Sequence, residues 1–373
     1  SASDLVQGEL AVNVTDKRLY TENASGAIVE LGTNPLGAVT MASTLGVTGV
    51  LTATSLDISG DIDVDGTSNL DVIDVDGAAN FAADVTFADG ADIITATAGT
   101  SNFRAGVNAG NSIASGGNYN TVVGDEAGTA ITTGDVNTFI GYSAGAATTT
   151  GGSNTGIGRL ALATNTTGVN NLAVGVNALY LLTTGTYNTG IGNSAGAAVT
   201  TGVNNTLIGG LAGDAITTGD DSVAIGYQAL GANTTGGGNI AIGSGALDAN
   251  TTAIHNVGVG TNALGGNTTG TANVALGHRA LLTNSTASNN TAVGYDSLKL
   301  NTTGAENTAV GALAGDAITT APYNTAVGYS ALSANTTGDG RNTAIGRAAL
   351  SATTTGNLNT AVGMNAGESV TTG

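Results

Sequence analysis

Residues 61–66, with the sequence DIDVDG, place three carboxylates at alternate positions in front of a glycine. This spacing is typical of the start of a calcium-binding loop, in which oxygen ligands two residues apart face one cation. Such loops carry a further carboxylate at the twelfth position, where this chain has Val72. Asp61, Asp63 and Asp65 are therefore candidate calcium ligands. The alternative is an acidic, solvated strand face with the intervening aliphatic residues turned inward. No other cofactor is indicated.

Four tyrosines occupy the same position of a repeat that is described below. An aromatic face offers a flat apolar contact to the C–H groups of a sugar ring. The four residues are therefore candidate contacts to a glycan, with surface decoration or packing as the alternative. They are Tyr142, Tyr227, Tyr295 and Tyr329.

Catalytic chemistry has little support in the sequence. The only histidines, His255 and His278, lie in variable positions of the repeat without an accompanying base or metal-binding group. Glycan cleavage needs two carboxylates about 5–9.5 Å apart. The pairs Asp125–Glu126 and Asp220–Asp221 are adjacent in the chain, so their side chains would diverge on a strand. The chain is predicted not to be an enzyme.

Composition excludes several classes of partner and fold. The chain has 27 acidic and 8 basic residues, a net charge of −19, so we expect it to avoid nucleic acids and anionic membranes. No apolar run reaches the roughly 18 residues of a membrane span, which argues against membrane insertion. Cysteine is absent, which excludes disulfides. With 60 glycines and 3% aromatic residues, the chain can fill only a thin core.

Sixteen repeats follow residue 101. Each begins with a motif such as NTAVG, and thirteen of the fifteen spacings between them are 17 residues, the other two being 18. Counting from the Asn, position one is Asn except at Ser222, and position five is always Gly. Representative members of these two columns are Asn171, Gly175, Asn188, Gly192, Gly226, Gly243, Asn324 and Gly328.

A unit of 17 residues is too short for a helical repeat and matches one coil of a parallel β-solenoid. NTAVG reads as a short strand, and the region near the end of the repeat that is most often Thr-Thr-Gly reads as a turn. The Val and Ile of position four are predicted to face the dry interior. Position five is expected to be Gly because its φ is positive or because backbone packs against it. The Asn column predicts a ladder of stacked amides.

Positions nine and twelve vary together. Where position nine is Leu, position twelve is usually Asn; where it is Gly, position twelve is usually Ile or Val. We interpret this as one pocket that holds a single apolar side chain, as expected of a packed core. Three repeats break the rule, at Leu179 with Leu182, at Gly145 with Thr148 and at Leu350 with Thr353.

The motifs NTAVG, NTAIG and SVAIG, the last at residues 222–226, resemble the head repeats of trimeric autotransporter adhesins. The resemblance covers residues 102–373 and implies a left-handed parallel β-roll that associates as a homotrimer. The present unit is longer than the usual head repeat.

Residues 8–32, GELAVNVTDKRLYTENASGAIVELG, resemble the N-terminal region of bacteriophage tail fibres. Their pattern predicts a three-stranded meander, with turns at Asp16–Lys17 and Ala24–Gly26. Residues 51–77 alternate apolar and polar side chains between glycines and resemble the interwoven trimeric shafts of such fibres.

The expected fold is therefore all-β: an N-terminal β module in residues 1–36, an acidic interwoven shaft in 37–101 and a sixteen-coil solenoid in 102–373. The expected function is structural, as a homotrimeric phage tail fibre that presents a receptor-binding tip. Its partners would be further copies of itself, a tail or baseplate protein of the virion and a glycan or protein receptor on the host surface. The alternatives are a trimeric adhesin on a bacterial cell surface and an ice-binding solenoid.

Overall fold

The computed structural model describes residues 7, 9–13, 15, 18–30 and 98–372. The chain divides into two compact units, Ser1–Val85 and Thr86–Gly373. The predicted shaft lies outside the described residues, except for 98–101, where the chain bends before the first coil. Among the described residues there is no helix that could span a membrane.

The described part of the first unit is a three-stranded antiparallel sheet in the order β1-β2-β3, which confirms the predicted meander. The second turn is held by Asn23, whose Oδ1 accepts hydrogen bonds from the backbone N–H groups of Ser25 and Ala27, both at 3.0 Å. Gly26 supplies the positive φ, 82°, that this turn requires. The strands are β1 (Leu10–Asn13), β2 (Arg18–Glu22) and β3 (Ile28–Glu30).

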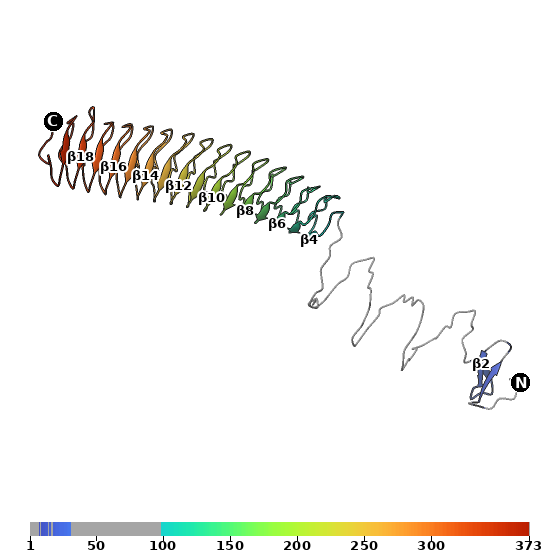
Figure 1. The fold of residues 1–373 in the computed structure, drawn as a ribbon. Coiled ribbons are helices and arrows are strands. Elements are labelled where there is room, and N and C mark those ends of the chain that lie inside the picture. The colour runs from blue at the N-terminus through green and yellow to red at the C-terminus, as the bar shows by residue number, and fades with distance from the viewer. Residues whose placement is uncertain (1–6, 8, 14, 16–17, 31–97, 373) are drawn as a thin grey trace. The chain divides into compact units, whose positions relative to one another are not determined.

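The second unit is a parallel β-solenoid with one three-residue strand per repeat (Figure 1). Each strand covers positions two to four and pairs in register with the next repeat; Thr189 of β9, for example, lies opposite Thr206 of β10. The strands are β4 (Phe103–Ala105), β5 (Thr121–Val123), β6 (Thr138–Ile140), β7 (Thr155–Ile157), β8 (Leu172–Val174), β9 (Thr189–Ile191), β10 (Thr206–Ile208), β11 (Val223–Ile225), β12 (Ile240–Ile242), β13 (Val257–Val259), β14 (Val274–Leu276), β15 (Thr291–Val293), β16 (Thr308–Val310), β17 (Thr325–Val327), β18 (Thr343–Ile345) and β19 (Thr360–Val362).

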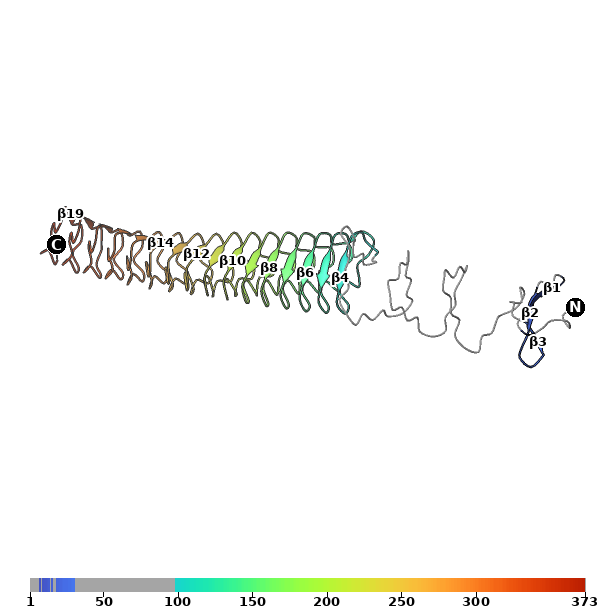
Figure 2. The ribbon, with the colours of Figure 1, turned by 90° about the horizontal axis from the view of Figure 1, so that it is seen from below.

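Hydrogen bonds between coils continue beyond the strands. In the turn that follows β6, Gly145 N–H donates to the carbonyl of Ala161 in the next coil at 2.9 Å. Near the end of the same repeat, Thr149 N–H donates to Thr166 O, also at 2.9 Å. The Thr-Thr-Gly segment is therefore part of the stacked coil. Along the stack the sheet turns gradually: Figure 2 shows β4 to β10 nearly face on and β14 to β19 along an edge.

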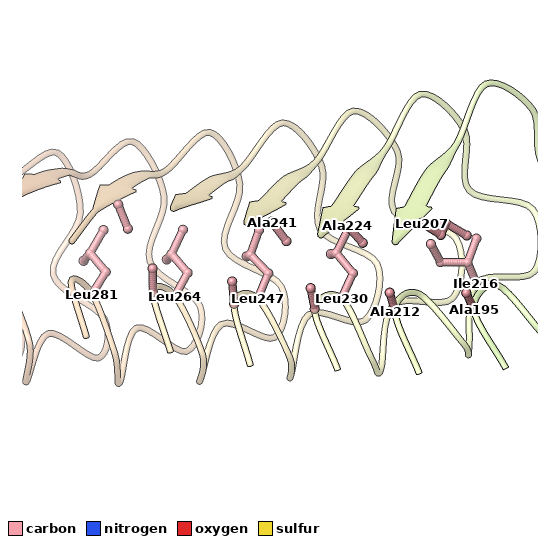
Figure 3. Packing of buried hydrophobic residues seen from close by; sticks show 14 of the residues in the cluster. Ala195, Leu207, Ala212, Ile216, Ala224, Leu230, Ala241, Leu247, Leu264 and Leu281 are labelled. Atoms are coloured by element: carbon pink, nitrogen blue, oxygen red, sulfur yellow. The ribbon is translucent and has the colours of Figure 1, made fainter. Parts of the chain in front are cut away.

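The interior is lined by position three, not by position four as predicted. Ala224 and Ala241 are fully buried, whereas Ile242 at position four is 37% exposed. The predicted alternation of faces is correct, but the two sides are reversed. The reason is volume: position nine or twelve already fills the coil with a large side chain, such as Leu230 or Leu247 (Figure 3), so most strands have room inside only for Ala or Gly.

The glycine at position five meets both conditions that the sequence left open. Gly226 and Gly243 have φ values of 134° and 133°. A Cβ on Gly243 would lie 2.6 Å from the carbonyl carbon and oxygen of Gly260 in the next coil. The backbones of successive coils thus approach too closely at this column for any side chain.

The coupling of positions nine and twelve is confirmed by the same kind of contact. A Cβ on Gly315 would lie 3.0 Å from Ile318 Cδ1, so the isoleucine of position twelve occupies the space that leucine of position nine fills elsewhere. Gly128 and Ile131 show the same relation at 2.7 Å.

Position three explains two of the three exceptions. Phe139 projects inward over Gly145, whose Cβ would lie 2.5 Å from the phenyl ring, and this ring replaces the missing aliphatic side chain. Leu179 and Leu182 both fit because the next coil has Gly190 at position three, where a Cβ would lie 2.8 Å from Leu179 Cγ. Positions three, nine and twelve of neighbouring coils therefore fill the interior together, as close packing requires.

Candidate interaction surfaces

Position one forms the predicted ladder of buried amides. Asn188 donates from its backbone N–H to Asn171 Oδ1 at 2.9 Å, and from Nδ2 to the same oxygen at 3.3 Å. Its Nδ2 also donates to the carbonyl of Gly202, at the end of its own coil, at 2.8 Å. Each asparagine therefore joins its coil to the preceding one and ties the start of the coil to its end. Buried polar atoms satisfied in this way stabilise a unique register.

A second ladder runs along position twelve where that position is Asn. From Asn250 to Asn301, each Nδ2 donates to Oδ1 of the asparagine one coil earlier at 2.8–2.9 Å. The ladder stops at Ile318, and Asn301 Oδ1 is left buried without a partner. Asn165 Oδ1, which precedes Leu182, and Asn335 Oδ1, which precedes Thr353, are unpaired in the same way. These ladders serve the stack, since their amides are buried away from any ligand.

The outer side of the sheet presents an uncharged, largely β-branched surface, which we call the strand face; its position four is aliphatic, and its position two is Thr in ten of the sixteen strands. It consists of the side chains at positions two and four of the sixteen strands, and none of them is charged. Its most exposed large members inside the stack are Ile140, Ile157, Ile240, Ile242, Val274, Leu276, Val310 and Ile345. Since a three-residue strand is about 10 Å long and sixteen strands extend about 75 Å, the strand face covers on the order of 750 Å².

The candidate glycan contacts Tyr142, Tyr227, Tyr295 and Tyr329 are half exposed at position six, just beyond the glycine that ends each strand motif. Tyr142 lies between Asp125 and Arg159 of the same column, and Tyr227 lies between Gly210 and Ser244. Tyr295 has an aromatic neighbour, His278, one coil earlier; the two rings are stacked, with centroids 5.5 Å apart and planes within 7°. The four tyrosines are thus not equivalent.

A cluster of charges that the sequence did not indicate borders Tyr295. Asp296, at position seven, is 4% exposed and accepts a hydrogen bond from Arg279 Nε at 2.8 Å, while Lys299 Nζ lies 3.3 Å from its Oδ2. Burial alone would raise the pKa of Asp296, but the bonds from Arg279 and Lys299 outweigh it and hold this pKa below its usual value. The sequence could have indicated this ion pair, because Arg279 and Asp296 have opposite charges and occupy position seven of adjacent repeats.

Three aspartates at position ten behave differently. Burial raises the pKa of Asp214, Asp248 and Asp316, because each carboxyl is partly withdrawn from water. Asp214 and Asp248 are separated by the coil that carries Gly231.

Across the described ranges, no three His, Cys, Asp or Glu side chains gather closely enough to hold a metal ion. The candidate calcium ligands Asp61, Asp63 and Asp65 lie outside those ranges.

The adjacent carboxylates are used between neighbouring coils. Asp220 Oδ1 accepts the backbone N–H of Val203 at 2.7 Å, and Asp221 Oδ1 accepts Asn204 Nδ2 at 2.9 Å. Glu126 Oε2 accepts the hydroxyl of Ser143. These bonds give the carboxylates a role in stacking the coils. His255 is exposed at the last position of its repeat.

The two threonines that end each repeat differ in role. Thr217 Oγ1, at position thirteen, donates to the carbonyl of Thr234 in the next coil at 3.1 Å, and this bond recurs along the rod. Thr218 and Thr235, at position fourteen, are exposed. Position thirteen is thus engaged between coils, whereas the threonines of position fourteen form a single exposed file.

No protein-family model, curated protein or solved structure matches this chain.

Proposed function

We propose that this chain forms the rod of a homotrimeric bacteriophage tail fibre, a structural protein of the virion that holds a receptor-binding tip away from the particle. The sixteen stacked coils of residues 102–373 support a spacer role, because their length is set by the number of coils and their interior is lined by buried aliphatic and asparagine side chains. The N-terminal meander also supports a tail fibre, since its three strands lie within residues 8–32, whose sequence resembles the N-terminal region of tail fibres.

The strand face is the observation that carries the proposal. About 750 Å² of uncharged, β-branched surface on one chain approaches the roughly 800 Å² that each partner contributes to a standard protein interface. A surface of this length and composition favours association, because a monomer would leave the aliphatic side chains of position four partly exposed to water along the whole rod. The occupant with a matching surface of equal length is another copy of the same chain.

Light scattering on the purified full chain tests the assembly. A homotrimer has three times the 35.8 kDa mass of one chain. The double variant Ile242→Lys, Leu276→Lys places two charges on the strand face and should reduce the mass to that of a monomer. The matched control Thr252→Lys, Thr286→Lys places the same charges in the same two coils, on the exposed threonine file, and should leave the mass unchanged. A wild-type chain that is a monodisperse monomer at micromolar concentration would contradict the proposal.

A trimeric adhesin of a bacterial cell surface is the second candidate, favoured by the likeness of the repeats to adhesin head repeats. It shares the homotrimer, so the mass does not separate the two. The encoding locus does: neighbouring capsid and tail genes favour the fibre, and a C-terminal outer-membrane barrel in the same gene favours the adhesin.

A further inference from the structure

Position six of four consecutive coils carries His278, Tyr295, Ala312 and Tyr329. Two aromatic rings are therefore separated by one coil whose side chain is only a methyl group. Tyr295 and Tyr329 are 51% and 52% exposed, so their rings are available at the surface. We infer that the space over Ala312 is a binding slot for one pyranose ring of a neutral glycan. This inference deepens the host-glycan contact of the proposed function and rests on it for its biological setting.

The spacing of the coils sets the width of the slot. Coils repeat about every 4.8 Å, so equivalent atoms two coils apart are separated by about 9.6 Å. A sugar ring held between two aromatic faces needs about 7–8 Å, from carbon–carbon contacts of 3.5–4.0 Å on each side. The slot therefore accepts one ring and has no room for two. Tyr142 and Tyr227 have no second aromatic residue two coils away at position six and cannot form such a slot.

One wall of the slot is held in place before any ligand binds. Tyr295 stacks on His278, and its hydroxyl accepts a hydrogen bond from Arg279 Nη2 at 3.2 Å. Arg279 is itself fixed by Asp296, which also pairs with Lys299. A side chain immobilised in this way loses little entropy on binding, which favours affinity. In the next coil, position six is Ala312, whose methyl group is too small to stack on the ring of Tyr295.

The charges around the slot favour a neutral sugar. Arg279 and Lys299 both pair with Asp296, and Lys299 also interacts with Asp316 of the next coil, so two carboxylates balance the two cations of this cluster. A pyranose ring matches this setting, because its apolar C–H groups can contact the aromatic walls while its hydroxyls stay in water at the open edge.

Saturation-transfer NMR of the full chain tests the slot with three probes, the methyl β-glycosides of galactose, glucose and N-acetylglucosamine. We expect transfer to the C–H protons of at least one probe, with millimolar affinity, and a loss of about tenfold in Tyr295→Ser and in Tyr329→Ser. Ala312→Leu fills the slot without removing a wall and should have the same effect. Tyr142→Ser removes an isolated tyrosine of the same column and should bind like the wild type.

Absence of transfer to all three probes overturns the inference, and so does an equal loss in Tyr142→Ser. Light scattering of each variant separates binding from assembly: a changed mass in Tyr329→Ser would assign that tyrosine to an interface and overturn the slot. A trimer that binds no probe rejects the slot and leaves the proposed fibre standing. A monomeric chain that shows the predicted pattern of binding among the variants rejects the proposed homotrimeric fibre and supports the slot.

Discussion

Two regions of the solenoid fill the same interior with different residues. In the coils that begin at 222, 239, 256, 273 and 290, leucine at position nine supplies the apolar bulk and asparagine at position twelve forms a ladder. In the coils that begin at 102, 120, 188 and 205, position nine is Gly and the bulk comes from Ile or Val at position twelve, without a ladder. The strands pair in the same register in both regions. The backbone of the coil is thus the same in both regions, and the apolar bulk of the interior can come from position nine or from position twelve, with position three contributing where it is larger than Ala.

The largest expected effect concerns the glycine column, which both regions share. Gly209→Val lies in an isoleucine-filled coil and Gly243→Val in a leucine-filled one; in each, the new side chain would meet the next backbone at 2.6 Å. We expect both to lose about 4 kcal/mol or more, from the clash and the strained φ together. Thermal melting followed by circular dichroism measures this. Gly363→Val is the control, because its φ is also positive but its nearest atom, Ala366 Cβ, is 3.8 Å away.

Equal losses at Gly209 and Gly243 with a clearly smaller loss at Gly363 would establish that the backbone constraint is independent of how the coil is filled. Unchanged melting of Gly243→Val would mean that the column is not closely packed.

A conversion of one coil into the other type tests the shared volume directly. Gly315→Leu alone overfills the coil, since a Cβ there is already 3.0 Å from Ile318 Cδ1, and should cost about 2–3 kcal/mol. The double variant Gly315→Leu, Ile318→Asn exchanges the apolar side chain between the two positions. It also gives the unpaired Asn301 Oδ1 a donor, and joins the ladder to Asn335. We expect the double variant to recover most of the loss, as measured by urea unfolding.

The opposite result, additive losses in Gly315→Leu and Ile318→Asn, would mean that positions nine and twelve do not share one pocket.

Interruption of the second ladder should have a smaller effect. Asn267→Ala removes the amide that donates to Asn250 Oδ1 at 2.9 Å and to Gly270 O at 2.9 Å, and leaves buried polar atoms unpaired. A loss of about 1–3 kcal/mol is expected in urea unfolding. Ile216→Val, in a coil without an asparagine at position twelve, is the comparison and should cost about 1 kcal/mol. A loss in Asn267→Ala no larger than this would show that the ladder adds little to stability.

The smallest effect is expected outside the interior. The pKa of Asp296 is lowered, so its contribution to stability is present above the ordinary aspartate pKa of about 3.9 and is lost as the pH falls through its folded value. Asp296→Asn should therefore melt slightly below the wild type at pH 7, by less than about 1 kcal/mol, and equal it near pH 2. Melting curves across this range give the difference. An undiminished gap at low pH would assign the effect to packing instead of charge.

The sequence predicted the coil, its register and its two most regular columns because these depend on local backbone geometry. A side chain at Gly243 would clash with the next backbone, and the amide of Asn188 pairs with an identical residue one coil earlier. Which face of the strand lies inside was predicted wrongly. That choice depends on the volume delivered from across the coil by residues such as Leu247, so Ile242 lies outside although it is larger than Ala241.

The candidate sites were likewise predictable from the sequence only in part. The shared column of Tyr295 and Tyr329 was visible in the sequence, but the bracing of Tyr295 by His278 and Arg279 was not, because it depends on which side chains lean on each other between coils. The pairing of Asp296 was missed for the same reason. Asp61, Asp63 and Asp65 remain a sequence-based prediction.

The gradual turning of the sheet along the stack, visible in Figure 2, has a consequence for any assembly. If two such solenoids lay side by side without coiling, their strand faces would turn away from each other along the stack. Chains that keep contact from β4 to β19 must instead coil around a common axis. The superhelical pitch of such an assembly would then be set within each chain, by the twist between one coil of the solenoid and the next.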